Sequence, residues 1–376
     1  MNQRYFDFNA TCPMLPVAIE AYSDCARQCG GNPSSMHWAG REARRALDDA
    51  RDVVATYFGV ESGAVVFTSG GTESNNLALS GWLARQAPGK VISSMIEHPS
   101  VLRPLERWDQ RDGWQVTLLR PNHDGVIAAS KVAAALDEGV RLVSIMAANN
   151  ETGVIQPLGE IAALCQQAGV ALHVDGVQAL GKLEVKKLAA EADFLSFSGH
   201  KIGGARGVGG LLVKRGRQLQ EQEPGGGQER KRRSGTENVA GICSLAAALG
   251  VIDFVAMAPL RDLFENSLLA ALPDAVVIGV DAPRTPNTSL FSIPGLEGET
   301  VLMQLDLAGF AVASGSACSS GQRRPSHVLM AMGLSPAQAR GSIRVSFGSE
   351  HDGSDVEALV AALVQVRVRL QAMGGR

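Results

Sequence analysis

Short apolar runs alternate with segments of helical spacing between about residue 50 and residue 250. The strand candidates are residues 65–67, 91–92, 116–119, 142–145, 172–174, 194–197 and 210–213. Between them, apolar positions recur every three to four residues, as at 128–136 and 159–169, which predicts helices. Because the strand candidates are apolar throughout instead of alternating, they predict an α/β fold with a mostly parallel sheet covered by helices on both faces.

The pattern changes after Gly250, where shorter strands and helices follow each other in a less regular order. Helices are predicted at 261–272, 298–305, 326–332 and 355–373, and strands at 276–278, 288–291, 312–314 and 343–346. A chain of 376 residues is long enough for two domains. The second half therefore predicts a smaller α/β lobe.

The net charge of −3 provides no overall field that would attract nucleic acid or an anionic membrane. One basic run stands out at Arg230–Arg233, and no aromatic residue is interleaved with it, so we expect a solvated or interface-facing loop. No apolar run reaches the roughly 18 residues of a membrane span, and the start of the chain lacks the apolar stretch of a signal peptide. We therefore expect a cytoplasmic protein that contacts neither membrane nor nucleic acid directly.

Six cysteines are too sparse in a chain of this length for a disulfide framework. Cys165 and Cys243 lie in apolar helical runs and are expected to be small core residues. Cys25 and Cys29 are four positions apart on a predicted helix, but no second pair supplies the remaining ligands of a structural zinc site. No metal site is predicted.

The most informative segment is Ser196–Lys201, which places a lysine directly after an apolar strand. Asp175 ends the preceding apolar strand. An enzyme that uses pyridoxal phosphate needs a lysine that bonds to the cofactor and a carboxylate that pairs with the pyridine nitrogen. Ser198 and His200 are placed to reach the phosphate, so this segment predicts the cofactor.

Other polar groups also follow strands of the predicted sheet. Gly71 and Thr72 follow one strand and open a helix; alone they could be a helix cap, but beside the Asp and Lys they predict a phosphate site. His98 could be a structural residue, or it could lie over the cofactor ring. Asn150 belongs either to an Asn-rich turn or to a site where its amide holds a substrate carboxylate or the cofactor's phenolate oxygen.

Two further residues each allow two interpretations from the sequence. Cys318 stands in a run of small residues, which is either a loop with an incidental thiol or one that carries a thiol to a reacting centre. Arg344 is either an exposed structural arginine or a bidentate carboxylate ligand.

Together these motifs resemble the cysteine desulfurases, pyridoxal phosphate enzymes of the class V aminotransferase group. The similarity runs nearly end to end and includes residues 31–37, 68–76, 97–98, 149–153, 173–178, 196–201, 225–236 and 314–318. Ser-Gly-His-Lys followed by Gly-Ser-Ala-Cys is highly specific. The resemblance implies the fold type I architecture, with a large domain at 15–255 and a small domain of 1–14 and 256–376 that carries the cysteine loop.

The resemblance also implies a role for each site residue. The catalytic residues would be Lys201 as the cofactor-bonding lysine, Cys318 as the persulfide-forming nucleophile and His98 as the ring-stacking proton carrier. Cofactor contacts would come from Gly71, Thr72, Asn150, Asp175, Gln178, Ser198 and His200, with Thr236 reaching the phosphate of the neighbouring subunit in a homodimer. Asn150 and Arg344 would bind the carboxylate of the substrate, L-cysteine.

The reaction implied is removal of sulfur from L-cysteine to give L-alanine, with transfer to a sulfur-acceptor protein. Iron–sulfur cluster assembly is the first choice for that pathway, ahead of tRNA or other thiolation. We hypothesise that Arg323 and Arg324 dock an acidic acceptor. Selenocysteine lyase is the nearest alternative, an aminotransferase is a weaker one, and a non-catalytic pyridoxal phosphate-binding scaffold is the alternative from another class.

Three positions depart from the family pattern. Cys12 stands where threonine is usual and could be a second reactive thiol. Asn9 is atypical, and Gln228 occupies a place where some relatives carry histidine.

Overall fold

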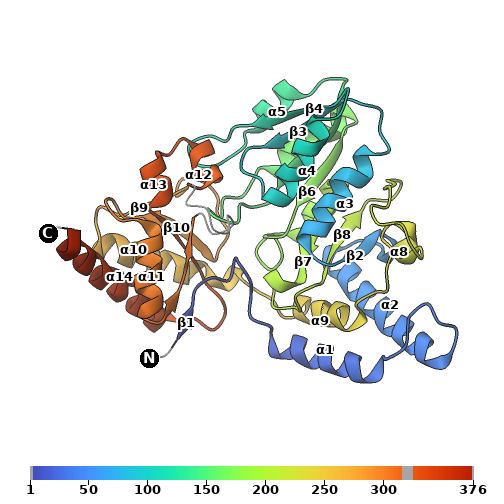
Figure 1. The fold of residues 1–376 in the computed structure, drawn as a ribbon, viewed down its shortest axis with the longest axis horizontal. Coiled ribbons are helices and arrows are strands. Elements are labelled where there is room, and N and C mark those ends of the chain that lie inside the picture. Colours follow the sequence, from blue (N-terminus) through green and yellow to red (C-terminus); the bar gives the residue numbers. More distant parts are fainter. Residues whose placement is uncertain (1–2, 316–324, 375–376) are drawn as a thin grey trace.

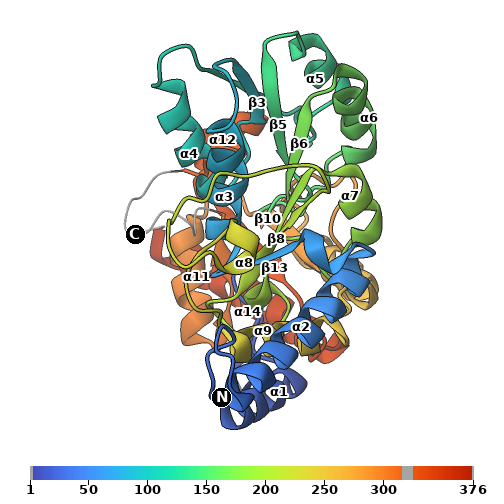
Figure 2. The same ribbon diagram turned by 90° about the vertical axis from the view of Figure 1, so that its right-hand side faces the viewer.

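The computed structural model describes residues 3–315 and 325–374, which form a large lobe and a smaller one side by side (Figures 1 and 2). The large lobe is built on a seven-stranded sheet of order β2-β8-β7-β6-β5-β3-β4. Its strands are β2 (Val65–Thr68), β3 (Lys90–Ser94), β4 (Gln115–Leu119), β5 (Val140–Met146), β6 (Ala171–Asp175), β7 (Phe194–Ser198) and β8 (Gly209–Val213). Strand β8 runs opposite to the other six, so the predicted α/β fold with a mostly parallel sheet is confirmed.

Helices cover both faces of this sheet, as the continuous apolar strands predicted. One face packs against α3 (Gly71–Leu83) and α4 (Pro99–Asp109). The opposite face packs against α1 (Pro16–Gln28), α2 (Trp38–Phe58), α5 (Ala129–Ala135), α6 (Leu158–Ala168), α7 (Val185–Glu191) and α9 (Val239–Leu249). The sheet is therefore buried on both sides, and its polar groups gather where the strands end.

The smaller lobe has its own apolar core around an antiparallel sheet of order β12-β13-β10-β9. These strands are β9 (Val276–Val277), β10 (Thr288–Ser292), β12 (Ala313–Ser314) and β13 (Ser342–Ser346). The helices of this half of the chain are α10 (Ala258–Ala271), α11 (Gly298–Leu307), α12 (His327–Met332), α13 (Pro336–Arg340) and α14 (Gly353–Gly374). The predicted second lobe is present with strands and helices close to their expected positions.

The beginning of the chain runs from the small lobe to the large one. Strand β1 (Arg4–Tyr5) pairs in parallel with β11 (Phe310–Ala311). Farther along, Cys12 N donates to the carbonyl oxygen of His200 over 2.8 Å, which attaches the segment to the large lobe. Residues 4–12 therefore contact both lobes and pass between them. The domain boundaries at residues 14/15 and 255/256 stay a prediction.

The segment that contains the basic run has an unusual backbone. Glu229, Arg230 and Lys231, within α8 (Gln228–Lys231), have φ values of 46°, 57° and 63°, a left-handed conformation that non-glycine residues seldom adopt. The Glu229 side chain is buried and paired in bidentate fashion with Arg51 of α2. Arg233 pairs with Glu73 of α3, so the run contacts the protein itself in part.

No helix in the described part of the chain is long and apolar enough to cross a membrane.

Candidate active site

The strand-end polar groups meet in one cavity of about 280 Å³ between the two lobes. Among the described residues, its lining includes all the predicted site residues except Thr236: Gly71, Thr72, His98, Asn150, Asp175, Gln178, Ser198, His200, Lys201 and Arg344. Strands β6 and β7 are in register with Asp175 beside Ser196, which explains why the Asp and the Ser-Gly-His-Lys segment reach the same edge of the sheet. The cavity therefore unites motifs that lie far apart in the sequence.

One end of the cavity has the features of a phosphate site. Helix α3 begins at Gly71, and its first N–H groups have no partner within the helix. A Cβ on Gly71 would lie 2.5 Å from Val177 Cγ2, so only glycine lets the loop approach this closely. Ser198 Oγ is buried without a hydrogen-bond partner, and an anion at this position would satisfy it. These features fit a phosphate group.

Asp175 supplies a carboxylate for a cationic ring nitrogen. It is only 6% exposed, and among the described residues no lysine or arginine forms an ion pair with it. Its Oδ2 accepts a hydrogen bond from Asn75 Nδ2 over 2.7 Å, and its Oδ1 accepts one from Val177 N over 3.0 Å. A buried carboxylate that is held only by neutral donors favours a positively charged partner, which a protonated pyridine nitrogen would be.

His98 caps the N-terminus of α4 and faces the same cavity. Its Nδ1 accepts the Ser100 N–H over 3.1 Å, so the proton of the neutral ring sits on Nε2. Burial lowers the pKa of His98, and Lys201 lowers it further, while Asp175 acts in the opposite direction. The imidazole is therefore held in its neutral form and can accept a proton.

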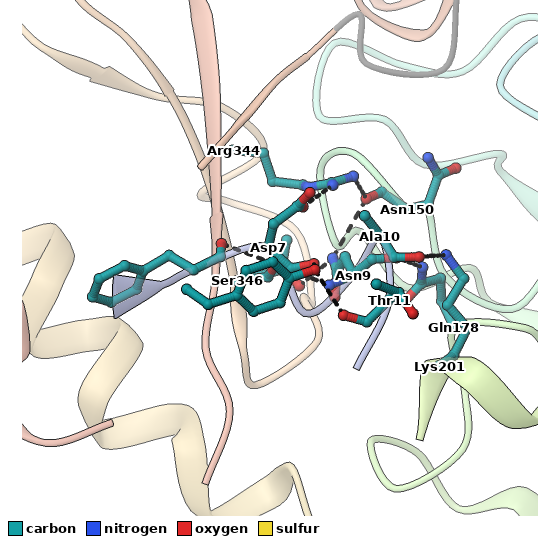
Figure 3. Close-up of polar contacts among 12 residues, drawn as sticks. Asp7, Asn9, Ala10, Thr11, Asn150, Gln178, Lys201, Arg344 and Ser346 are labelled. Atoms are coloured by element: carbon teal, nitrogen blue, oxygen red, sulfur yellow. Dashed lines mark hydrogen bonds and ion pairs between the residues drawn. The ribbon is translucent and has the colours of Figure 1, made fainter. Parts of the chain in front are cut away.

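Lys201 follows β7 in the short helix η2 (Gly199–Lys201). Its amine reaches residues 4–12, the crossing N-terminal segment that passes between the lobes (Figure 3). Nζ donates to the main-chain carbonyl of Asn9 over 2.6 Å and to that of Ala10 over 2.9 Å. Gln178 Nε2 donates to the same Asn9 carbonyl over 3.0 Å. The backbone of residues 9–10 thus holds the lysine and the glutamine on one side of the cavity.

Arg344 of β13 approaches from the small lobe, and only 3% of it is exposed, so the exposed structural alternative is wrong. Its Nη1 donates to the main-chain carbonyl of Asn150 over 2.7 Å, and its Nη2 pairs with Asp7 (Figure 3). Its Nε is buried without a hydrogen-bond partner. A cavity-lining guanidinium with an unused donor suits a substrate carboxylate.

One predicted residue of the described part of the chain, Thr236, is not in this group. Thr236 is exposed and lines a separate hollow with Ser69 and Arg233, and its role at a phosphate stays a prediction. Cys318, together with Arg323 and Arg324, lies outside the described residues. Cys12 is buried, and burial raises the pKa of its thiol to about 12, which argues against a second reactive thiol.

The sequence reasoning missed three residues around the cavity. Asn75 lies inside the segment 68–76, but nothing in its spacing showed that it would hold Asp175. Asn9 was noted only as atypical, yet its main chain and its side chain both bind site residues. Lys182 was not singled out, although its position four residues after Gln178 is a helical spacing that brings side chains together.

Comparison with known proteins agrees with this geometry. The aminotransferase class-V family matches residues 4–359. An IscS-like cysteine desulfurase of Mycobacterium tuberculosis is 39% identical over 373 residues, which cover 96% of this chain and 95% of the relative. A solved NifS-like protein is 32% identical with a TM-score of 0.89, covering 97% of this chain and 99% of that one. A structure described as SspA in complex with cysteine is 30% identical with a TM-score of 0.83, covering 92% and 98%. The chain therefore belongs to the aminotransferase class-V family, as its resemblance to the cysteine desulfurases predicted.

Proposed function

We propose that this chain is a cysteine desulfurase that uses pyridoxal 5′-phosphate to convert L-cysteine into L-alanine and leaves the sulfur as a persulfide on Cys318. The observation that carries the proposal is the single cavity in which Lys201, Asp175 and the phosphate-type end meet. Relatives named as cysteine desulfurases, similar over nearly the whole chain, support the same reaction.

The residues present fit the cofactor at each of its polar positions. Ser198 Oγ and the first N–H groups of α3 would hold the phosphate, with Thr72 and His200 beside them. Asp175 would pair with the ring nitrogen, and Gln178 would donate to the phenolic oxygen. Lys201 would bond to the aldehyde carbon. When bound, pyridoxal phosphate accepts electron density from the substrate's Cα and so makes that carbon acidic.

The chain's own groups then orient the substrate and move its protons. Arg344, with Asn150 beside it, would hold the substrate carboxylate at the small-lobe side of the cavity. The Lys201 amine, once released by the incoming amino acid, would take the proton from Cα. His98, neutral with a lowered pKa, would serve as a second proton acceptor in the cavity.

Sulfur transfer requires the thiolate of Cys318. Its sulfur would attack the sulfur of the bound cysteine, so that a new S–S bond forms as the substrate's C–S bond breaks. The electron pair of the broken bond stays on carbon, which then takes up a proton. The balance is L-cysteine plus enzyme thiol giving L-alanine plus enzyme persulfide, and no external oxidant is needed.

The partners follow from the same proposal. Thr236 would reach the phosphate of a second copy of the chain, which makes the working enzyme a homodimer. A sulfur-acceptor protein would receive the persulfide sulfur, with iron–sulfur cluster assembly as the first candidate, and Arg323 and Arg324 would help dock an acidic acceptor. The enzyme would act in the cytoplasm.

The deciding experiment measures alanine formed from L-cysteine and a thiol reductant by the parent, Cys318→Ser and Lys201→Ala. Cys243→Ser is the control, because it removes a half-buried thiol that does not line the cavity. We expect alanine and sulfide in equal amounts from the parent and the control, and neither from the other two. Equal alanine from Cys318→Ser would exclude this mechanism and favour selenocysteine lyase, and no alanine from any protein would favour the non-catalytic scaffold.

A further inference from the structure

Lys182 lies behind the cavity lining, hydrogen-bonded to Gln178 and Asn9, and the proposed reaction gives it no role. It is 6% exposed and follows Gln178 by four residues in the turn after β6. Its Nζ donates to Gln178 Oε1 over 2.7 Å and to Asn9 Oδ1 over 2.8 Å. The ring of Phe254 lies 5.2 Å from the same nitrogen. In these contacts the amine meets only neutral groups.

The surroundings of Lys182 disfavour its charged form. Burial lowers the pKa of Lys182 well below its usual value, and the positive charges of Lys201 and Arg344 lower it further. The Cys12 thiol acts in the opposite direction, and among the described residues no carboxylate is paired with the amine. The amine donates to both of the acceptors that it contacts, Gln178 Oε1 and Asn9 Oδ1.

These two hydrogen bonds decide how the neighbouring groups are oriented. The two ends of a glutamine amide are nearly equal in size, so its hydrogen-bond partners determine which end points where. Lys182 donates to Gln178 Oε1, so the other end of the amide, Nε2, faces the main-chain carbonyl of Asn9. It also holds Asn9, whose main-chain carbonyl accepts from both Gln178 Nε2 and Lys201 Nζ.

We propose that Lys182 is a positioning residue, which keeps the Gln178 N–H turned toward the cofactor's phenolic oxygen and the Asn9 carbonyl turned toward Lys201. The inference rests on the proposed function, because it concerns how Gln178 meets pyridoxal phosphate. A donor to the phenolic oxygen stabilises the anionic form of that oxygen. The oxygen then attracts less strongly the proton on the nitrogen that joins Lys201 to the cofactor. Without Lys182 the amide can turn its oxygen toward the cofactor, and that stabilisation is lost.

The test is a pH titration of the visible absorbance of the cofactor bonded to Lys201, in the parent and in Lys182→Met. We expect the pKa of that linkage to rise by about one unit, since a lost hydrogen bond to an anion typically shifts a pKa on this scale. Lys187→Met, an exposed lysine nearby in the chain, should leave it unchanged. Lys182→Arg, which retains N–H donors, should restore most of the parental value.

A double variant separates positioning from general damage to the fold. In a Gln178→Leu background the amide is gone, so adding Lys182→Met should cause no further shift. An additive shift would overturn the proposal, as would an unchanged pKa in Lys182→Met. If Lys182→Met does not retain the cofactor, Lys182→Gln is titrated instead. A rise in the pKa of the linkage is expected there too, and an unchanged pKa would overturn the proposal. A parent that gains no visible absorbance with pyridoxal phosphate would instead overturn the proposed function and this inference together.

Discussion

Asn75 and Asp175 are 100 positions apart in the chain, and the amide of the first donates to the carboxylate of the second over 2.7 Å. Asn75 lies in the first turns of α3, the helix whose N-terminus forms the phosphate-type end of the cavity. The same amide nitrogen donates to Ser100 Oγ over 2.9 Å. One side chain thus connects the phosphate end, the carboxylate and, through Ser100, His98.

Replacing Asn75 by alanine removes the side-chain donor to Asp175, so the carboxylate loses a hydrogen bond worth about 1.5–3 kcal/mol. We expect the rate of alanine formation to fall about 10- to 100-fold, since 1.4 kcal/mol corresponds to a factor of ten. The control is Asn76→Ala, because the Asn76 amide donates to the main-chain carbonyl of Thr72 in its own helix. Equal losses in the two variants would contradict a role for Asn75 through Asp175.

Ser198→Ala should affect the empty and the loaded protein differently. Its Oγ is buried without a partner, so losing it should leave the apoprotein as stable as the parent or more so. Cofactor affinity should fall about fivefold, the value of one hydrogen bond of about 1 kcal/mol. Urea unfolding of the apoprotein and titration with pyridoxal phosphate measure the two effects.

Ser196→Ala is the matched control for that experiment. Ser196 lies two residues earlier on the same strand, and its Oγ is hydrogen-bonded to His173 Nε2 over 3.0 Å. Here we expect the reverse result, a less stable apoprotein with unchanged affinity for the cofactor. Weaker cofactor binding in this variant too would show that the strand tolerates no change, and the phosphate assignment of Ser198 would lose its support.

Glu97 should make stability depend on pH in an unusual direction. Burial raises the pKa of Glu97 to about 8, although Ser94 and the Met146 N–H donate to its Oε1. The folded state then keeps a proton that the unfolded state loses above about pH 4.5, so stability falls as pH rises from about 5 to 8. Glu97→Gln cannot ionise and should lack this loss.

The difference in unfolding free energy between Glu97→Gln and the parent should therefore grow by about 1.4 kcal/mol per pH unit in that window. Urea unfolding at pH 5, 6, 7 and 8 measures it. Glu61→Gln, at an exposed position, should follow the parent at every pH. A constant difference between Glu97→Gln and the parent would mean that Glu97 is ionised throughout.

The buried pair of Arg51 and Glu229 should be among the costliest contacts to break. Their side chains are 5% and 1% exposed, and Glu229 also accepts the Phe67 N–H over 2.9 Å. Glu229→Gln leaves Arg51 charged and buried, so we expect a loss of about 3–5 kcal/mol in urea unfolding. Asp48→Asn, which breaks the exposed pair with Arg44, should cost less than about 1 kcal/mol.

The sequence predicted the strands of the main sheet closely because each is a continuous apolar run ended by polar or glycine residues. It also predicted which strand ends carry chemistry, since Asp175 and Lys201 follow such runs directly. Local pattern could not show pairing across hundreds of residues, so the contacts of Asn9, Asp7 and Lys182 were missed. The left-handed turn at Glu229 was missed as well, because a tertiary ion pair holds a backbone that its own residues disfavour.

The crossing N-terminal segment has a consequence for when the enzyme becomes active during its synthesis. Asn9 N bonds to Ser346 Oγ, and Asp7 pairs with Arg344, so each contact spans 337 positions. A ribosome releases the first of these residues long before it makes the second, and contacts of such separation form late. The carbonyls of residues 9 and 10 that receive Lys201 therefore reach their places only after nearly all of the chain has emerged. A nascent chain that already holds the complete large-lobe sheet would still lack a finished cavity, and the activity that depends on it, until Arg344 and Ser346 have emerged.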